Sequence, residues 1–192
     1  MTEFITIVIL TIIIICIFMN YETKLSELVY VKFKIDNREY LVRNRDDKED
    51  AADLLAKLNK SILKLIEYLE LKFPNDDRIN RLVTKFNPDK ISESIANTKY
   101  TSYSVNKGEK IVFCIRSKDE NENLVKFNTI LFVAIHELAH IMTKSIGHTE
   151  EFWDNMKFLL IHAIKKKIYK KVDYKKNPEE YCGTNITDSP LQ

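Results

Sequence analysis

The 192-residue sequence is poor in the residues that build loop-rich or fibrous proteins. Only three glycines and four prolines are present, which excludes collagen-like and low-complexity designs. An excess of one charge is also lacking, because 30 Lys and Arg face 28 Asp and Glu. The chain as a whole is therefore not a strongly basic nucleic-acid binder. Its length and its 45% hydrophobic residues suit one globular domain plus a small addition.

Cysteine is too scarce for a disulfide framework, because Cys16, Cys114 and Cys182 are scattered over the chain. Cys16 falls in an apolar N-terminal run, which leaves Cys114 and Cys182 as residues that could pair. We expect free thiols in a reducing compartment instead.

The N-terminal run from Phe4 to Met19 contains no charged residue. As a helix it would span about 24 Å, slightly less than a hydrocarbon core of about 30 Å. Glu3 precedes the run and no small-residue cleavage site follows it, so we predict an uncleaved transmembrane anchor over residues 1–21 rather than a signal peptide. The basic residues near it lie on its C-terminal side, which predicts a single-pass protein whose catalytic domain is cytosolic; they are Lys24, Lys32 and Lys34.

Two hairpins are predicted in residues 22–176. Apolar residues alternate with lysines from Leu28 to Ile35, and the chain returns from Glu39 to Arg43 after a polar turn. A second pair of strands, 100–105 and 110–117, flanks Gly108.

Helical spacing of apolar residues predicts a long helix that begins near residues 46–50 and ends before Pro74. Asn75 can cap a shorter helix after it. We predict an α+β fold of the minimal zincin-like kind for residues 22–176, with a small antiparallel sheet packed on several helices, and a C-terminal tail over residues 177–192.

The main candidate metal-binding and catalytic residues lie in the apolar stretch from Thr129 to Lys144, which carries His136, Glu137 and His140. Unpaired imidazoles and a carboxylate are costly in such a helix. Residues i and i+4 lie on one face of a helix, so His136 and His140 can hold one ion while Glu137 reaches a water on it. This is the H-E-x-x-H pattern of zinc peptidases.

A third ligand follows the helix. Gly147 favours a left-handed turn that would bring His148 back toward the first two imidazoles. Three protein ligands and one open position are the catalytic zinc pattern, so we predict Zn²⁺ on His136, His140 and His148. Alternative third ligands are weaker, because the next helix would have to aim them; they are Glu151 and Asp154. Phe152 and Trp153 are predicted to pack against the turn, and His162 to be structural.

The predicted chemistry is peptide-bond hydrolysis. Zinc lowers the pKa of its bound water toward about 7, and Glu137 takes the proton as general base. A donor to the oxyanion is also needed, and Tyr100, Tyr103 and Tyr181 are available without a reason to choose. A protein or peptide substrate could bind as an extra strand beside residues 110–117, unless that strand is merely half-buried structure.

The segment HELAHIMTKSIGHTEEFW resembles the WLM and SprT-like minimal zinc peptidases, as does the hairpin before it, over about 70 residues. The C-terminal YCGTNITDSP resembles versions of this family encoded by large DNA viruses. The resemblance implies that His136, His140 and His148 bind zinc and that Glu137 is the catalytic acid/base. It also implies proteolysis of proteins crosslinked to DNA, in some members with ubiquitin-like partners. This chain adds an apolar N-terminus and shows no evident zinc ribbon.

Lysines dominate the segment from Lys165 to Lys176, with Tyr169 and Tyr174 between them. Such a segment can follow a phosphate backbone and stack on bases, or lie on an anionic lipid surface. A solvated helix end is the third interpretation.

The favoured hypothesis is therefore a membrane-anchored, zinc-dependent endopeptidase. One alternative is a catalytically silent, zinc-stabilised binding module that tethers nucleic acid or a protein partner at a membrane. Another is a metal-free, soluble structural domain. Glu137 favours the enzyme, because zinc affinity alone does not require a carboxylate at that position.

Overall fold

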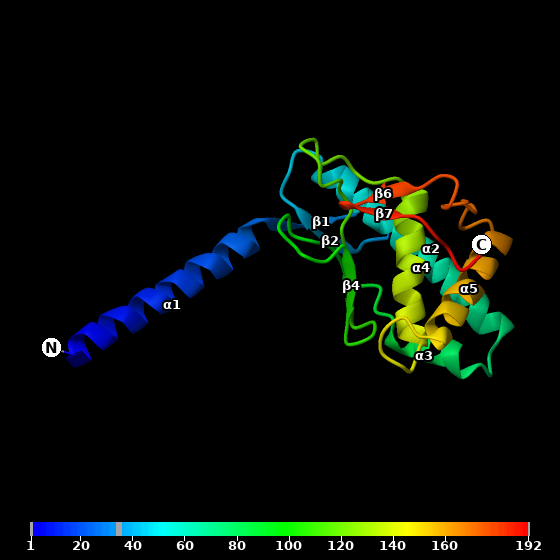
Figure 1. Ribbon diagram of the computed structural model, residues 1–192, viewed down its shortest axis with the longest axis horizontal. Helices are drawn as coiled ribbons and strands as arrows, with labels where there is room; N and C mark the ends of the chain where they lie inside the picture. Colours follow the sequence, from blue (N-terminus) through cyan, green and yellow to red (C-terminus); the bar gives the residue numbers. More distant parts are fainter. Residues whose placement is uncertain (1, 34–35, 192) are drawn as a thin grey trace.

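The computed structural model describes residues 2–33 and 36–191, so Lys34 and Ile35 lie outside the described part of the chain. Its helices are α1 (Thr2–Ser26), α2 (Lys48–Lys72), α3 (Asp77–Lys85), α4 (Phe127–Met142) and α5 (Glu150–Lys165). Its strands are β1 (Leu28–Lys32), β2 (Glu39–Arg43), β3 (Ile91–Glu93), β4 (Ser102–Val105), β5 (Lys110–Phe113), β6 (Glu179–Tyr181) and β7 (Thr184–Ile186). Figure 1 shows α1 projecting from a domain formed by the other elements.

The main sheet has the strand order β1-β2-β3-β5-β4. The two predicted hairpins are confirmed, since β1 pairs antiparallel with β2 and β4 with β5. The predicted antiparallel sheet is wrong, because β3 joins the hairpins by running parallel to both β2 and β5. With three residues, β3 is too short to show a period in the sequence. The sheet is therefore mixed.

The long helix is confirmed as α2, which turns an apolar stripe into the core, including Leu55, Leu58 and Leu65. Each such side chain contributes roughly 1.5–3 kcal/mol when fully buried. The cap predicted for α3 is one residue off, because the Asp76 carboxylate, and not Asn75, accepts the Arg78 N–H at 2.9 Å.

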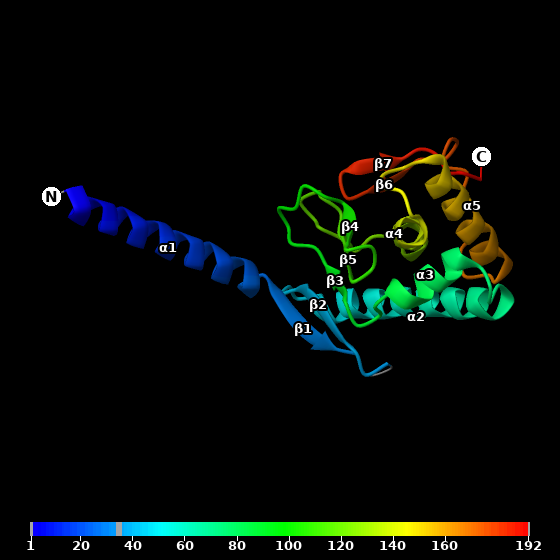
Figure 2. The ribbon, with the colours of Figure 1, turned by 90° about the horizontal axis from the view of Figure 1, so that it is seen from below.

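Helix α4 runs through the middle of the domain. Strands β4 and β5 lie on one side of it, α5 lies on the other, and α2 and α3 cover a third side (Figure 2). A helix surrounded in this way is apolar over most of its surface, as its sequence predicts. Only the side of α4 that these elements leave uncovered can carry polar side chains without burying them among apolar ones.

Helix α1 lies outside this packing and contacts the domain through β1. Within it, the 18 residues Phe4–Tyr21 have a mean hydropathy of 2.7 and none of them is buried. Among the described residues, α1 is the one helix long and apolar enough to cross a membrane.

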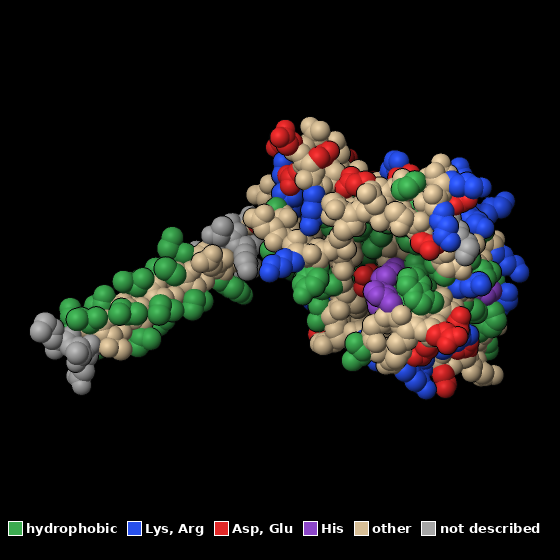
Figure 3. Space-filling view, viewed as in Figure 1, with side chains coloured by type: hydrophobic (Ala, Val, Ile, Leu, Met, Phe, Trp, Pro, Cys, Tyr) green, Lys and Arg blue, Asp and Glu red, His purple; other side chains and the backbone are tan. Residues whose placement is uncertain are grey.

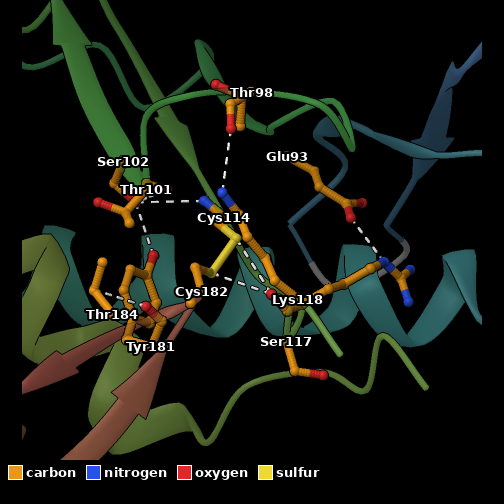
Figure 4. Close-up of a disulfide and its surroundings, with 12 residues drawn as sticks. Glu93, Thr98, Thr101, Ser102, Cys114, Ser117, Lys118, Tyr181, Cys182 and Thr184 are labelled. Carbon is orange, nitrogen blue, oxygen red and sulfur yellow. Dashed lines mark hydrogen bonds and ion pairs between the residues drawn. A yellow bond between two sulfur atoms is a disulfide. The ribbon is translucent and has the colours of Figure 1, made fainter. Parts of the chain in front are cut away.

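Of residues 177–192, predicted as a tail, the described part, 177–191, contains the hairpin β6–β7 and packs on the domain. Tyr181 and Cys182 are 3% and 1% exposed. Cys182 forms a disulfide with Cys114, so the prediction of free thiols at these positions is wrong (Figure 4). The two cysteines are 68 residues apart, and only the fold brings the hairpin to the end of β5. Cys16 is free and exposed.

Candidate metal centre

The centre is built on α4, which begins two residues before the predicted Thr129 and ends at Met142. His136 and His140 are one turn apart on its cleft-facing side, with 3.2 Å between their Nε2 atoms. Thr143 caps the C-terminus of the helix, and its N–H and hydroxyl both donate to the carbonyl of Ala139, at 3.0 and 2.7 Å. Beyond Thr143 the chain leaves the helix and can turn back toward the two histidines.

The predicted left-handed turn is confirmed at Gly147, where φ is +85°. A Cβ there would meet nothing within 4 Å, so backbone conformation rather than space favours glycine. The turn places the Nε2 atom of His148 at 3.1 Å from that of His136. One nitrogen from each of the three histidines lies within 4.8 Å of the others, which confirms that the residues converge.

Two charged side chains hold the turn between α4 and α5. The Lys107 ammonium, from the β4–β5 turn, donates to the carbonyls of Thr143, Lys144 and Ser145 at 2.8, 2.8 and 3.0 Å. On the other side, the Glu151 carboxylate accepts the N–H groups of Lys144 and Ser145 at 3.0 and 3.2 Å. The loop that carries His148 is therefore held in place by the hydrogen bonds of both Lys107 and Glu151.

Aromatic rings from the first turn of α5 pack against the histidines. Phe152 is fully buried, and its ring centroid lies 4.8, 4.3 and 4.7 Å from those of His136, His140 and His148. Trp153 stacks on His148 at 5.7 Å and is 44% exposed. The predicted packing of this pair against the turn is confirmed.

Burial sets the protonation of the centre. It lowers the pKa of His136 to about 3 and that of His140 to about 4, in each case helped by His148 nearby. Both imidazoles are therefore neutral at physiological pH, which is the form that binds a metal. Burial raises the pKa of Glu137 to about 7, which is suitable for a group that accepts and releases a proton.

The donor set fits zinc. A tetrahedral zinc with bonds of about 2.0–2.1 Å to imidazole separates two ligand nitrogens by roughly 3.3 Å. The distances of 3.1 and 3.2 Å from His136 to the other two histidines match that separation. Three imidazoles with an adjacent cleft also match the open coordination of catalytic zinc.

The cleft beside the histidines has a volume of about 650 Å³. Its walls come from α4, from β4, from the turn before α5 and from the β6–β7 hairpin. Figure 3 shows histidine side chains gathered in a hollow of the domain, with hydrophobic side chains around them. The cleft is therefore open to an incoming ligand.

Other predicted residues take different places. His162 packs against Phe73 and Phe158 at centroid distances of 5.2 and 4.6 Å, away from the centre, as a structural histidine should. Glu151 binds the turn and Asp154 is exposed, so neither belongs to the histidine cluster. Strand β5 is interior, because it pairs with β3 and β4; of the two edge strands, β1 and β4, it is β4 that borders the cleft.

The three candidate oxyanion donors differ in how exposed they are and in whether they line the cleft. Tyr100 is 67% exposed and does not line the cleft, whereas Tyr103 lines it and is 37% exposed. Tyr181 lines the cleft from the β6–β7 hairpin and is 3% exposed. Nothing local in the sequence places it there, because β6 reaches α4 only through the fold.

The lysine segment begins where α5 ends, at Lys165. Its seven lysines are exposed, but Tyr169 and Tyr174 are 3% and 0% exposed and pack on Phe132. These two rings are therefore closed to base stacking. Asn128 of α4 holds the segment in place by bonding the main chain of Lys170 at 2.9 and 3.0 Å.

Together these features define an α+β protein with a three-histidine candidate metal centre in its cleft. The chain belongs to the WLM domain family, which matches residues 33–190. The resemblance inferred from the HELAH segment is thereby confirmed, and with it a metallopeptidase-like, zinc-associated family.

Its relatives include viral proteins. Over 182 residues the chain is 37% identical to uncharacterized protein R325 of Acanthamoeba polyphaga mimivirus, covering 91% of this chain and 90% of the relative. Over 69 residues it is 36% identical to uncharacterized protein 136R of Invertebrate iridescent virus 6, covering 35% and 38%. The expected likeness to proteins of large DNA viruses is confirmed.

Solved structures give a more distant likeness. Wss1 from Saccharomyces cerevisiae aligns with 66% of this chain and 88% of its own, at 19% identity and a TM-score of 0.47. A mutant of the same protein aligns with 67% and 92%, at 20% identity and a TM-score of 0.48. The family assignment rests on the WLM match and on the mimivirus relative.

Proposed function

We propose that this protein is a zinc-dependent endopeptidase. The observation that carries the proposal is the convergence of His136, His140 and His148 in a cleft that also holds the buried carboxyl group of Glu137. A binding module that needed zinc only for stability would need no carboxyl group there, and burying one without use is costly.

In this function the three histidines would hold a zinc ion, which would supply a bound water of lowered pKa and polarise the scissile carbonyl. Glu137 removes the proton from the attacking water. Its pKa of about 7 lets it hold that proton and then deliver it to the leaving nitrogen. Phe152 excludes water from beneath the imidazoles and keeps their rings oriented.

The substrate would be a protein or peptide in extended form. Strand β4 is an edge strand of the main sheet and forms one wall of the cleft. An extended peptide can pair with such an edge through main-chain hydrogen bonds, which tolerate many sequences. This moves the proposed binding edge from β5 to β4.

Membrane anchoring through α1 is part of the proposal. It is supported by the length, the apolar composition and the complete exposure of Phe4–Tyr21. A charge-free surface of this size is costly in water. Sedimentation of the full chain with membranes, resistant to carbonate and lost when residues 1–26 are deleted, tests this part.

The test of the activity compares the full chain with its Glu137→Gln variant in detergent micelles. Both should bind one equivalent of zinc, and only the parent should cleave unfolded casein. The matched control is Glu150→Gln, an exposed carboxylate outside the cleft, which should cleave normally. If the Glu137 variant cleaves as fast as the parent, the enzyme hypothesis is wrong. If neither cleaves any unfolded protein but both hold zinc, the binding module replaces it.

The lysine segment is proposed to bind a polyanion by its phosphates alone. Its seven lysines are exposed, and the segment lies at the end of the domain remote from α1 (Figures 1 and 2). That position favours nucleic acid over the membrane that α1 would cross, and the buried tyrosines leave only the phosphate contacts. Retention on duplex DNA that falls steeply with salt, without retention on anionic vesicles by the chain lacking α1, would support this choice.

A further inference from the structure

We propose that Tyr181 is a catalytic residue whose hydroxyl group donates a hydrogen bond to the oxyanion formed at the scissile carbonyl. This inference rests on the proposed function and names the donor that the three histidines and Glu137 do not supply. Three observations support it: the position of Tyr181 in the cleft, the contacts that orient its hydroxyl group, and the disulfide that holds its hairpin.

The position of Tyr181 is the first argument. Strand β6 packs on α4, and Tyr181 lines the same cleft as His136 and Glu137. The side chain is 3% exposed, so its hydroxyl group has little access to bulk water. Tyr103 also lines the cleft, but it is 37% exposed and packs edge-on against the exposed Tyr100 at 5.7 Å. Of the three tyrosines, Tyr181 is therefore the desolvated one.

The hydroxyl group is oriented by Ser102 of β4. The Tyr181 oxygen lies 2.7 Å from Ser102 Oγ. Figure 4 shows the two side chains close to each other beside the disulfide. Ser102 Oγ is itself held, because it donates to the Thr101 carbonyl at 2.9 Å and accepts the Cys114 N–H at 3.3 Å. The Tyr181 hydroxyl group thus lies against the strand along which an extended substrate would place its carbonyls.

The disulfide fixes the hairpin that carries Tyr181. Cys182 follows Tyr181 directly and is bonded to Cys114 at the end of β5. Cys182 and Gly183 take φ values of +51° and +79°, which make the tight turn of the hairpin. Tyr181 is therefore held by Ser102 at its hydroxyl end and by the disulfide at its backbone. Because both ends are held, the Tyr181 oxygen stays in place and only its O–H bond has to rotate from Ser102 Oγ toward the oxyanion, which keeps the reorganisation small.

Burial, assisted by the charge of Glu137, raises the pKa of Tyr181 above its ordinary value. The hydroxyl group therefore stays protonated and remains a neutral donor at any physiological pH.

The step balances without a further reactant. Water oxygen bonds to the carbonyl carbon while Glu137 accepts a water proton, and the C=O π electrons move to the oxygen. The Tyr181 O–H then donates to that oxygen in place of Ser102 Oγ, and its own O–H bond does not break. When the C–N bond breaks, its electron pair goes to nitrogen, which receives the proton from Glu137. The hydrogen bond is strongest when the oxygen is charged, so it stabilises the transition state more than the substrate.

The test is Tyr181→Phe in the full chain, which removes one oxygen and keeps the buried ring. The substrate is a peptide copied from the casein site that the parent cleaves. We expect kcat to fall about 100-fold while KM changes less than about threefold. Zinc content and the unfolding temperature with zinc bound should stay close to those of the parent. Tyr100→Phe, at an exposed tyrosine that does not line the cleft, is the control and should keep its kcat.

A second readout separates catalysis from structure. A phosphinic version of the peptide imitates the charged tetrahedral oxygen, whereas a hydroxamate version binds mainly through zinc. Tyr181→Phe should weaken the phosphinic inhibitor by about the factor lost in kcat/KM and leave the hydroxamate within about threefold. A structural defect would weaken both inhibitors alike.

The outcomes distinguish this inference from the proposed function. Full kcat in Tyr181→Phe, with Glu137→Gln inactive, overturns the role of Tyr181 and leaves the enzyme standing. Loss of kcat with equal weakening of both inhibitors, or with loss of zinc, also overturns the role. If Glu137→Gln is fully active, the proposed function fails and the role of Tyr181 fails with it.

Discussion

The Lys107 ammonium lies 2.8 Å from the carbonyl oxygen of Thr143, the residue that caps the C-terminus of α4. Two further carbonyls, of Lys144 and Ser145, accept from the same ammonium. A lysine of the β4–β5 turn therefore caps the helix that carries two histidines and steadies the loop that carries the third. The β4–β5 hairpin and the loop that carries His148 are joined through this side chain.

Lys107→Met should weaken zinc binding about tenfold. The methionine keeps most of the apolar stem but leaves three carbonyls without their shared donor, and charged donors contribute about 1.5–3 kcal/mol. Competition with a zinc chelator measures the affinity. Lys99→Met, an exposed lysine that does not line the cleft, is the control and should bind zinc as the parent does. Equal affinities in the two variants would contradict the role given to Lys107.

Glu151 should make the turn sensitive to acid. The N–H groups of Lys144 and Ser145, and then the Ser145 hydroxyl group, lower the pKa of Glu151 to about 2 from an ordinary 4.5. A group whose folded pKa is lowered stabilises the fold above its unfolded pKa, and this contribution disappears as pH falls through the folded value. Glu151→Gln should therefore lower the unfolding temperature at pH 7 and converge with the parent as pH falls from about 5 to about 2.

Thermal unfolding of metal-free protein at several pH values checks this expectation, because imidazole protonation is then common to both chains. Glu150→Gln, the neighbouring exposed residue of the first turn of α5, controls for the helix dipole. A difference between Glu151→Gln and the parent that is unchanged at pH 2 would show that the carboxylate is not the cause.

His148 and His162 should respond in opposite ways to substitution. His148→Ala removes one of three converging nitrogens and should abolish stoichiometric zinc binding and cleavage, with little effect on the metal-free fold because His148 is exposed. His162→Ala removes a ring packed on Phe73 and Phe158, so it should lower the free energy of unfolding by about 1–3 kcal/mol and retain zinc. Metal analysis and chemical denaturation measure the two quantities. Zinc loss in His162→Ala alone would refute the assignment.

Replacing both Cys114 and Cys182 with serine should lower the free energy of unfolding by about 2–4 kcal/mol. The 68-residue separation makes the closed loop long, and loop closure in the unfolded chain is the main stabilising effect in the chain-entropy model. Amide exchange should accelerate most in β6 and β7. Denaturant unfolding of the oxidised parent and the double variant gives the difference, and an unchanged midpoint would contradict the expectation.

The same bond also bears on the orientation of the proposed membrane anchor. Disulfides persist in oxidising compartments, which opposes the cytosolic domain predicted from the lysines on the C-terminal side of Phe4–Met19. Thiol labelling in intact membranes distinguishes the two: labelling of Cys114 and Cys182 without reductant would favour the cytosolic side.

The convergence of the three histidines could be predicted because each position follows from a local rule. The four-residue spacing puts His136 and His140 on one helix face, and Gly147 predicts the turn that returns His148. The long helix α2 was predictable for the same reason, since its apolar residues recur at the helical period.

The strand β3, the disulfide and the place of Tyr181 could not be predicted. Strand β3 has three residues and therefore no visible period, and Cys114 meets Cys182 across 68 residues of intervening chain. Tyr169 and Tyr174 alternate with lysines in the way exposed residues do, yet they fill the core beside Phe132. Burial of this kind depends on the partner surface, which is distant in sequence.

Local sequence patterns predict the helices, the hairpins β1–β2 and β4–β5, the apolar N-terminal segment and the convergence of three histidines. Each of these depends on backbone geometry within about a dozen residues. The tertiary structure alone shows which edge strand borders the cleft, which cysteines meet and which tyrosine enters the cleft. Those choices depend on contacts between elements far apart in the chain, and packing against a common core selects them.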